Sequence, residues 1–209
     1  MTIVLWHAQG HGRLSPMSAL RFSVDFATGL LRPARQVLCT HFDARPHGAV
    51  PELIVLHGIS LPPGQFGGGW VERLFCGALP PHQHPYFAAV SAARVSAHLF
   101  IARDGEVTQF VPFDQRAWHA GASSYRGRSA CNDFSIGVEL EGTDELPYQD
   151  AQYRVLTPLL RALLRDISSL QRDHIVGHSD IAPGRKTDPG LSFDWQRLRT
   201  SLSVDESKN

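Results

Sequence analysis

The chain has 209 residues, enough for one domain with a full core but too few for two domains to be the default expectation. Its 20 basic residues balance its 20 acidic residues, so no net field attracts a polyanion, and no basic stripe is interleaved with aromatic residues. Nucleic acid and the membrane surface are therefore not expected as partners.

The cysteines and the N-terminus favour a cytoplasmic protein. Cys39, Cys76 and Cys131 form no CxxC pair, and an odd number of cysteines cannot all pair within one chain, which fits a reducing compartment. The first residues lack the charged start and the longer apolar core of a secretory signal. No segment approaches the roughly 20 apolar residues of a membrane-spanning helix.

Glycine and proline interrupt every period in residues 1–33, which predicts an extended arm or a short appended pair of strands. Within it, His7 and His11 are interpreted as exposed loop histidines. We place the main domain at 34–202, and the polar tail 203–209 is expected to be disordered.

Several segments after the arm have clear secondary-structure patterns. An Asp-Gly turn at Asp104 predicts an antiparallel hairpin over 97–111, because such turns match the twist of paired strands. Apolar spacings of three and four predict an amphipathic helix over 149–169, in which Pro158 should cause a kink or mark a late start. The remaining predicted elements are strands at 52–57, 135–142 and 174–178 and helices at 70–75 and from Asp194 onward.

The segment from His178 to Gly190, HSDIAPGRKTDPG, is the most informative in the chain. Prolines and glycines make it a rigid, irregular loop that can aim side chains. His178 and Asp188 offer nitrogen and oxygen ligands suited to zinc, and a third ligand from elsewhere would leave one position open for water.

His57 is the candidate third ligand because it ends a predicted buried strand, and ligand crevices lie beyond such strand ends. The alternative is a core histidine bonded to a neighbouring carbonyl. Together, His57, His178 and Asp188 predict a site for one zinc ion that activates water for hydrolysis.

Two further residues suit that chemistry. Glu139 emerges near a strand end and is the candidate general base, and Lys186 could stabilise an oxyanion. The pair Trp118 and His119 could wall an aromatic pocket, or could equally be a buried aromatic beside a satisfied histidine.

Several long motifs, in order along the chain, resemble the AmpD-type N-acetylmuramoyl-L-alanine amidases. They are ELIVLHGISLPPGQFGG, HPYF, RVSAHLFIARDGEVTQFVPFDQRAWHAG, CNDFSIGVELEGTD, YQDAQY and GHSDIAPGRKTDPG, and the resemblance runs from about Ala34 to Leu202. It implies an α/β fold with a mixed central β-sheet flanked by helices, shared with peptidoglycan-recognition proteins.

Position by position, the resemblance implies that His57, His178 and Asp188 bind zinc and that Glu139 and Lys186 are catalytic. Arg94 matches an arginine associated with the stem-peptide carboxylates. Gly58 is a departure, because enterobacterial members have Asn there, and one polar substrate contact is in doubt. His98, at the start of the hairpin, and Trp118 complete the predicted substrate-binding residues.

The reaction implied by the resemblance is cleavage of the amide between N-acetylmuramic acid and L-alanine. The subgroup is similar to the cytoplasmic enzymes that act on 1,6-anhydro-muropeptides in cell-wall recycling, which limits β-lactamase induction where that system exists. We expect this chain to be a monomer. Two alternatives stay open: a non-catalytic peptidoglycan-binding module, which loss of a zinc ligand would favour, and a lytic amidase on intact wall, which export signals would favour.

Overall fold

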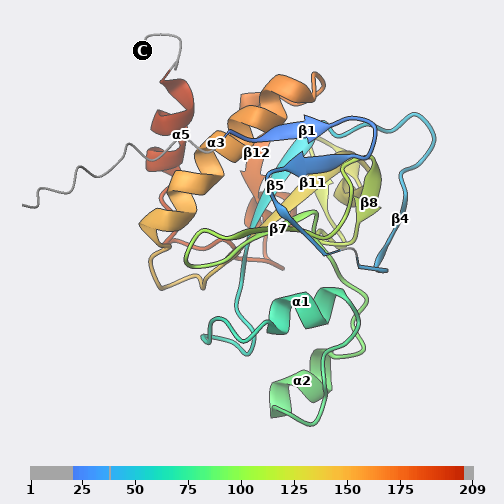
Figure 1. Ribbon diagram of the computed structural model, residues 1–209, viewed down its shortest axis with the longest axis vertical. Coiled ribbons are helices and arrows are strands. Elements are labelled where there is room, and N and C mark those ends of the chain that lie inside the picture. Colours follow the sequence, from blue (N-terminus) through green and yellow to red (C-terminus); the bar gives the residue numbers. More distant parts are fainter. Residues whose placement is uncertain (1–20, 38, 205–209) are drawn as a thin grey trace, which may run out of the picture.

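The protein is described here by a computed structural model that covers residues 21–37 and 39–204. Its centre is a mixed sheet in the order β12-β5-β11-β6-β7-β3 (Figure 1). Strands β12, β5, β11 and β6 are parallel, β7 is antiparallel to β6, and β3 is parallel to β7. The bounds are β3 Arg35–Gln36, β5 Leu53–Ile59, β6 Leu99–Ile101, β7 Val107–Gln109, β11 Ser135–Glu141 and β12 Ile175–Gly177.

The other elements surround this sheet. Two-stranded ribbons are formed by β1 Ser23–Asp25 with β2 Leu30–Arg32, β4 Phe42–Ala44 with β8 Gln115–Ala117, and β9 Ser124–Tyr125 with β10 Arg128–Ser129. The helices are α1 Trp70–Phe75, α2 Pro85–Val90, α3 Asp150–Asp166, α4 His178–Ile181 and α5 Trp195–Ser203, with short 3-10 turns at Cys131–Phe134 and Arg172–His174. This architecture confirms the predicted fold class.

The two faces of the sheet follow from the period of two along a strand. Even-numbered residues of β5 and β11, such as Ile54 and Val138, pack beneath α3 and α5 in the largest core cluster. Odd-numbered residues point to the opposite face, where Leu53 and Val55 join a smaller cluster. We refer to this second face as the site face, because His57 and Glu139 occupy odd positions at its edge.

Helix α3 is amphipathic as predicted and lies along the sheet (Figure 1). It begins at Asp150 and runs through Pro158, so of the two effects expected of this proline, a kink or a late start, the late start does not occur. The side chain of Gln152 accepts a hydrogen bond from the backbone nitrogen of Gln149 at 2.9 Å, which satisfies one donor at the helix start. Burial of its leucines outweighs the single backbone bond that the proline cannot make.

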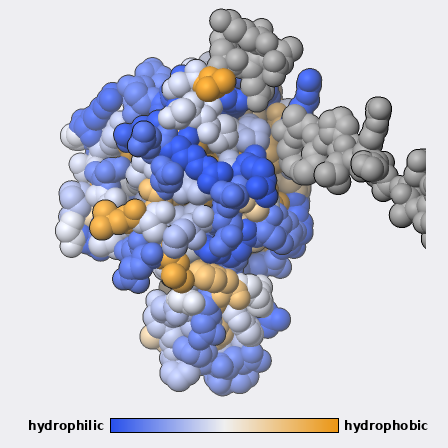
Figure 2. Space-filling view, turned by 90° about the vertical axis from the view of Figure 1, so that its left-hand side faces the viewer, coloured by the Kyte–Doolittle hydropathy of each residue, from blue (hydrophilic) through white to orange (hydrophobic). Residues whose placement is uncertain are grey.

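Helices α1 and α2 form a smaller lobe below the sheet. Figure 2 shows the lobe as a narrow extension of the main body with a largely hydrophilic surface. Its interior is a separate cluster in which Leu74, Phe75 and Phe87 pack against Phe110 and Val111 at the end of the sheet. In the part of the chain that the structure covers, no helix is both long enough and apolar enough to cross a bilayer.

The strand pair β1–β2 lies against α3, and its two strands pair from Ser23 to Arg32. Phe22, Val24 and Leu31 are buried in the largest core cluster together with residues of the sheet and of α3. Of the two forms expected for the N-terminal region, an extended arm or a strand pair, the residues from 21 onward contain the pair, while His7, His11 and the tail from 205 lie outside the described residues.

Candidate active site

The three predicted metal ligands lie at one edge of the sheet. His57 is near the carboxyl end of β5, and His178 follows directly after β12. Because β12 pairs with β5 in parallel, with Gly177 opposite Leu56, the two histidines are brought level with each other. The loop after α4 then returns Asp188 to the same point.

The ligand atoms of this set converge. The Nδ1 atoms of His57 and His178 are 3.0 Å apart, and Asp188 Oδ2 lies 3.2 Å from the first and 3.0 Å from the second. Neighbouring ligands of a tetrahedral zinc ion, at bond lengths of about 2.0–2.1 Å, are about 3.3 Å apart. Two imidazole nitrogens and one carboxylate oxygen at this spacing therefore fit a zinc ion.

The electrostatics of the set also suit a cation. Burial lowers the pKa of His57 to about 4, so its ring is neutral at pH 7. Burial by itself would raise the pKa of Asp188, but hydrogen bonds with His178 and His57 outweigh it and hold that pKa below its usual range. A neutral imidazole and an ionised carboxylate are the protonation states that bind metal.

The loop of Asp188 is held against the ends of two strands by Pro189. A Cβ added to Gly58 would lie 3.5 Å from the Cα of Pro189, and one added to Gly177 would lie 2.9 Å from its Cδ. The hydroxyl of Tyr148 donates to the carbonyl of Pro189 at 3.0 Å. Two glycines and a buried tyrosine thus place the carboxylate beside the histidines.

Glu139 lies beside this set. It is opposite His57 in the parallel pairing of β11 with β5, so both side chains project from the site face. The residue is 8% exposed, and its Oε2 atom is buried without a hydrogen-bond partner. Burial, together with the charge of Asp188, raises the pKa of Glu139 well above its ordinary value, although Lys186 opposes that shift.

The remaining predicted residues differ in their placement. Lys186 is exposed on the loop of Asp188, and its charge acts on both Glu139 and His57. Arg94 is exposed and places its guanidinium carbon 5.0 Å from the ring centroid of Trp118. The indole nitrogen of Trp118 donates to Asp43 at 3.0 Å.

His98 is a correction to the predicted substrate contacts. Its side chain has no exposed surface, so it cannot touch a substrate in this structure. Its Nδ1 accepts a hydrogen bond from the backbone nitrogen of Gly137 at 3.0 Å, and its Nε2 lies 3.1 Å from the carbonyl oxygen of Gln115. His98 therefore joins β11 to the segment around β8 as a core histidine.

Two residues near the ligands were missed as site residues. His119 was interpreted only as a pocket wall or a buried histidine, yet its Nδ1 lies 2.9 Å from Nε2 of His57. Tyr148 sits in the YQDAQY motif without any feature that marks it. The motif RAWHAG already placed a histidine next to Trp118, but only the fold shows which residue it contacts.

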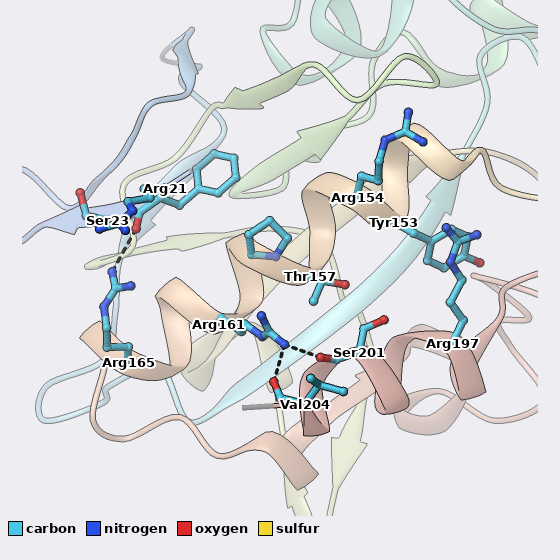
Figure 3. Close-up of a pocket in the computed structure, with 12 residues that line it drawn as sticks. Arg21, Ser23, Tyr153, Arg154, Thr157, Arg161, Arg165, Arg197, Ser201 and Val204 are labelled. Carbon is cyan, nitrogen blue, oxygen red and sulfur yellow. Dashed lines mark hydrogen bonds between the residues drawn. The ribbon is translucent and has the colours of Figure 1, made fainter. Parts of the chain in front are cut away.

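Cavities border the loop and also lie away from it. One of about 860 Å³ is lined by Lys186, Thr187 and Trp195 and adjoins the loop of Asp188. A cavity of about 1010 Å³ lies between α3, α5 and the start of β1, and Figure 3 shows the arginines around it. Arg161 and Arg165 there donate to backbone carbonyls of Ser201, Val204 and Phe22. None of the predicted site residues lines this larger cavity.

The family model for N-acetylmuramoyl-L-alanine amidase matches residues 47–191, which include the three candidate ligands, Glu139 and Lys186. The chain belongs to the N-acetylmuramoyl-L-alanine amidase family. This membership confirms the resemblance seen in the sequence and makes the chain an amidase.

Individual relatives agree with this. The amidase is 54% identical over 180 residues to the 1,6-anhydro-N-acetylmuramyl-L-alanine amidase AmpD of Citrobacter freundii, covering 86% of this chain and 96% of the relative. A crystal structure of a selenomethionine derivative of AmpD superposes with a TM-score of 0.82 at 55% identity, covering 86% of this chain and 99% of that one.

A more distant structure carries a ligand. It is AmpDh3 from Pseudomonas aeruginosa in complex with an anhydromuramic pentapeptide, with a TM-score of 0.59 at 27% identity, covering 75% of this chain and 61% of that one.

Proposed function

We propose that this amidase holds one zinc ion with His57, His178 and Asp188 and hydrolyses the amide between 1,6-anhydro-N-acetylmuramic acid and L-alanine in muropeptides. The convergence of the three ligand atoms at 3.0–3.2 Å beside the unpartnered carboxyl of Glu139 carries the proposal. Cleavage of this bond is the reaction named for relatives that match this chain over most of its length.

A resonance-stabilised amide needs an activated water, a stabilised oxyanion and a proton for the leaving amine. A zinc ion held by these residues would supply Lewis acidity, which polarises a carbonyl and lowers the pKa of water. Glu139 projects from β11 next to the ligands and takes a proton from the attacking water, then gives it to the departing L-alanine nitrogen. Its raised pKa suits a group that must both accept and release a proton.

Charged groups around the site suit an acidic peptide substrate. Lys186 carries the positive charge nearest in sequence to Asp188 and stabilises the oxygen that becomes negative when the amide carbon is attacked. Arg94, exposed and stacked on Trp118, is the partner for a stem-peptide carboxylate. A bound anhydromuramic pentapeptide in the P. aeruginosa structure supports a substrate of this class.

Two substitutions separate metal binding from catalysis. His178→Ala should lose both bound zinc and amide cleavage, because a nitrogen ligand disappears. Glu139→Gln should keep zinc, and its turnover rate should fall by about 10²–10⁴-fold, the usual contribution of a general base. Zinc is measured by elemental analysis and cleavage by chromatography of a digested anhydro-muropeptide.

The outcomes of that experiment discriminate among functions. Full activity in a metal-free preparation contradicts the mechanism. A wild-type protein that binds zinc and muropeptide without cleaving it would instead be a binding module.

Substrate preference and location form the finer part of the proposal. We infer that the amidase acts in the cytoplasm during cell-wall recycling and prefers the anhydro sugar to intact wall. Digests of purified anhydro-muropeptides and of intact sacculi, compared at equal enzyme concentration, should release L-alanine-terminated peptide mainly from the former. Equal release from sacculi would favour a lytic enzyme.

A further inference from the structure

One short segment, residues 118–120, lies behind both histidines of the proposed metal site. The ring of His119 meets His57, with His119 Nδ1 2.9 Å from His57 Nε2. The carbonyl oxygen of Ala120, the next residue, lies 3.1 Å from His178 Nε2. Both imidazoles are thus contacted from one side by neighbouring residues of a single segment.

These contacts define where the protons lie. A metal at the point where the two Nδ1 atoms meet requires a lone pair on each, so both rings carry their proton on Nε2. His57 then donates to Nδ1 of His119, which places the proton of His119 on its own Nε2. That nitrogen lies 3.1 Å from the hydroxyl oxygen of Ser135 and donates to it. His178 donates to the carbonyl of Ala120. Every ring nitrogen in this arrangement has a partner.

Asn132 holds the segment in place. Its side-chain oxygen accepts hydrogen bonds from the backbone nitrogens of His119, at 3.1 Å, and Ala120, at 2.8 Å. The ring of His119 also packs directly on β11, since a Cβ added to Gly137 would lie 2.4 Å from it. His119 is 9% exposed and Ala120 is fully buried.

We propose that His119 and Asn132 are positioning residues for zinc. His119 fixes the tautomer and orientation of His57. Asn132 fixes the backbone at Ala120, whose carbonyl oxygen fixes the tautomer and orientation of His178. The inference rests on the proposed zinc site and goes beyond its ligands. Removing a group that orients a histidine ligand in this way commonly lowers metal affinity by about 10- to 100-fold.

The test compares substitutions that keep or remove each hydrogen-bond acceptor. His119→Asn keeps an amide oxygen near the place of Nδ1, whereas His119→Leu removes the acceptor. Asn132→Asp keeps the side-chain oxygen that accepts from both backbone nitrogens, whereas Asn132→Ala removes it. His174→Asn and His174→Leu serve as controls, because His174 is a half-buried histidine with both ring nitrogens in contact at the far end of β12.

The main measurement is the zinc dissociation constant, obtained by competition with a chelator for each full-length variant. His119→Leu and Asn132→Ala should weaken zinc binding by about 10- to 100-fold. His119→Asn and Asn132→Asp should recover most of that loss, and the His174 variants should bind zinc like the wild type. Thermal midpoints of the metal-free proteins show whether each variant is folded.

A second readout reports on the proton itself. Nitrogen-15 NMR of the imidazoles distinguishes the two neutral tautomers, and His57 in the zinc-loaded wild type should carry its proton on Nε2 and donate it to His119. In a folded, zinc-loaded His119→Leu variant that proton loses its acceptor, so its signal should shift and exchange faster with water. An unchanged Nε2 proton signal together with unchanged zinc affinity overturns the inference.

The two levels of the proposal fail differently. If the wild type binds no zinc, or if the His178→Ala variant still binds it, the proposed metal site is wrong. If the wild type binds zinc through its three ligands and His119→Leu and Asn132→Ala bind it equally well, the ligands stand and only the positioning role is lost.

Discussion

At the scale of single residues, burial and neighbouring charges shift the pKa values of the groups in the site. Glu139 is buried next to the ionised Asp188 and has an oxygen without a hydrogen-bond partner. An unpartnered buried carboxyl costs stability, and such a cost is typical of groups kept for chemistry. His98 is the opposite case, because both of its ring nitrogens are in contact with the chain.

The burial of Glu139 predicts a pH-dependent stability difference. Because its pKa is raised in the folded state, the folded protein binds an extra proton between the ordinary pKa of about 4.3 and the raised value. The stability from this group is therefore present below about pH 4.3 and is lost as the pH rises through the folded pKa. Glu139→Gln removes this loss, because its side chain does not titrate.

We expect metal-free Glu139→Gln to unfold at a higher temperature than the metal-free wild type at pH 8, and the difference to shrink toward pH 4. For a chain of this size each kcal/mol shifts the midpoint by about 2–4 °C. Thermal scans in the presence of a chelator at pH 4, 6 and 8 measure this. A difference that is the same at all three values, or that grows at low pH, would contradict it.

At the scale of elements, the ends of β5 and β11 and the loop of Asp188 meet at Tyr148. Its hydroxyl occupies the space beside Gly58, where an added Cβ would lie only 2.2 Å from the hydroxyl oxygen. An added Cβ at Gly142 would meet the same ring at 2.3 Å. From the sequence, Gly58 differed from related amidases only in a doubtful substrate contact. In the fold, the glycine also leaves the space that the hydroxyl of Tyr148 fills.

This contact predicts a non-additive pair of substitutions. Gly58→Ala alone should destabilise the protein by about 1–3 kcal/mol, because it overpacks a filled site. Tyr148→Phe alone should cost about 1 kcal/mol by removing the hydrogen bond to Pro189. In the double variant the nearest atoms to the new methyl group lie at 3.5 and 3.6 Å, which is ordinary contact. Gly58→Ala should therefore cost almost nothing in that background.

Urea unfolding of the wild type, both single variants and the double variant completes the cycle. Costs that simply add would show that the methyl group at position 58 is accommodated without moving Tyr148.

The elements that the sequence predicted well are those with local signals. The Asp-Gly turn lies between β6 and β7, Trp70–Phe75 is helical as predicted, and Asp194 caps α5 by accepting from Arg197. The error at His98 has another origin. Whether a histidine is satisfied in the core or exposed in a site depends on residues distant in sequence, such as Gly137 and Gln115 for His98.

The candidate site was predicted in the same uneven way. His57, His178 and Asp188 could be chosen because each stands at a strand end or in a stiff loop and has a metal-binding side chain. The residues behind them could not, because Asn132 and Ser135 carry no local signal and reach His119 only through the pairing and packing of β11.

At the scale of the whole molecule, the strand pair β1–β2 belongs to the same core as the sheet. Leu31 is fully buried, and its backbone nitrogen donates to the side chain of Gln109 in β7 at 2.6 Å. The backbone nitrogen of Val24 donates to Asp166 at the end of α3. The pair therefore joins strand β7 of the sheet to the helix that covers the sheet.

Leu31→Ala should lower the free energy of unfolding by about 2–5 kcal/mol, as expected for a large side chain removed from a packed core. Zinc content and turnover of the folded variant should match the wild type, because Leu31 lies on the helix face of the sheet. Chemical unfolding and elemental analysis of the same preparations measure both. A cost below about 0.5 kcal/mol, the scale of surface substitutions, would show that the strand pair contributes little to the core.

The alternation along β5 has a consequence for how this enzyme can change over time. A single residue gained between Glu52 and His57 would turn the histidine into the apolar core beneath α3 and place Leu56 at the proposed metal site, and a single residue lost would place Gly58 there. Exchanges of one apolar side chain for another leave the histidine where it is. The strand should thus accept varied composition while keeping a fixed length, and indels among its descendants should fall in the connecting loops.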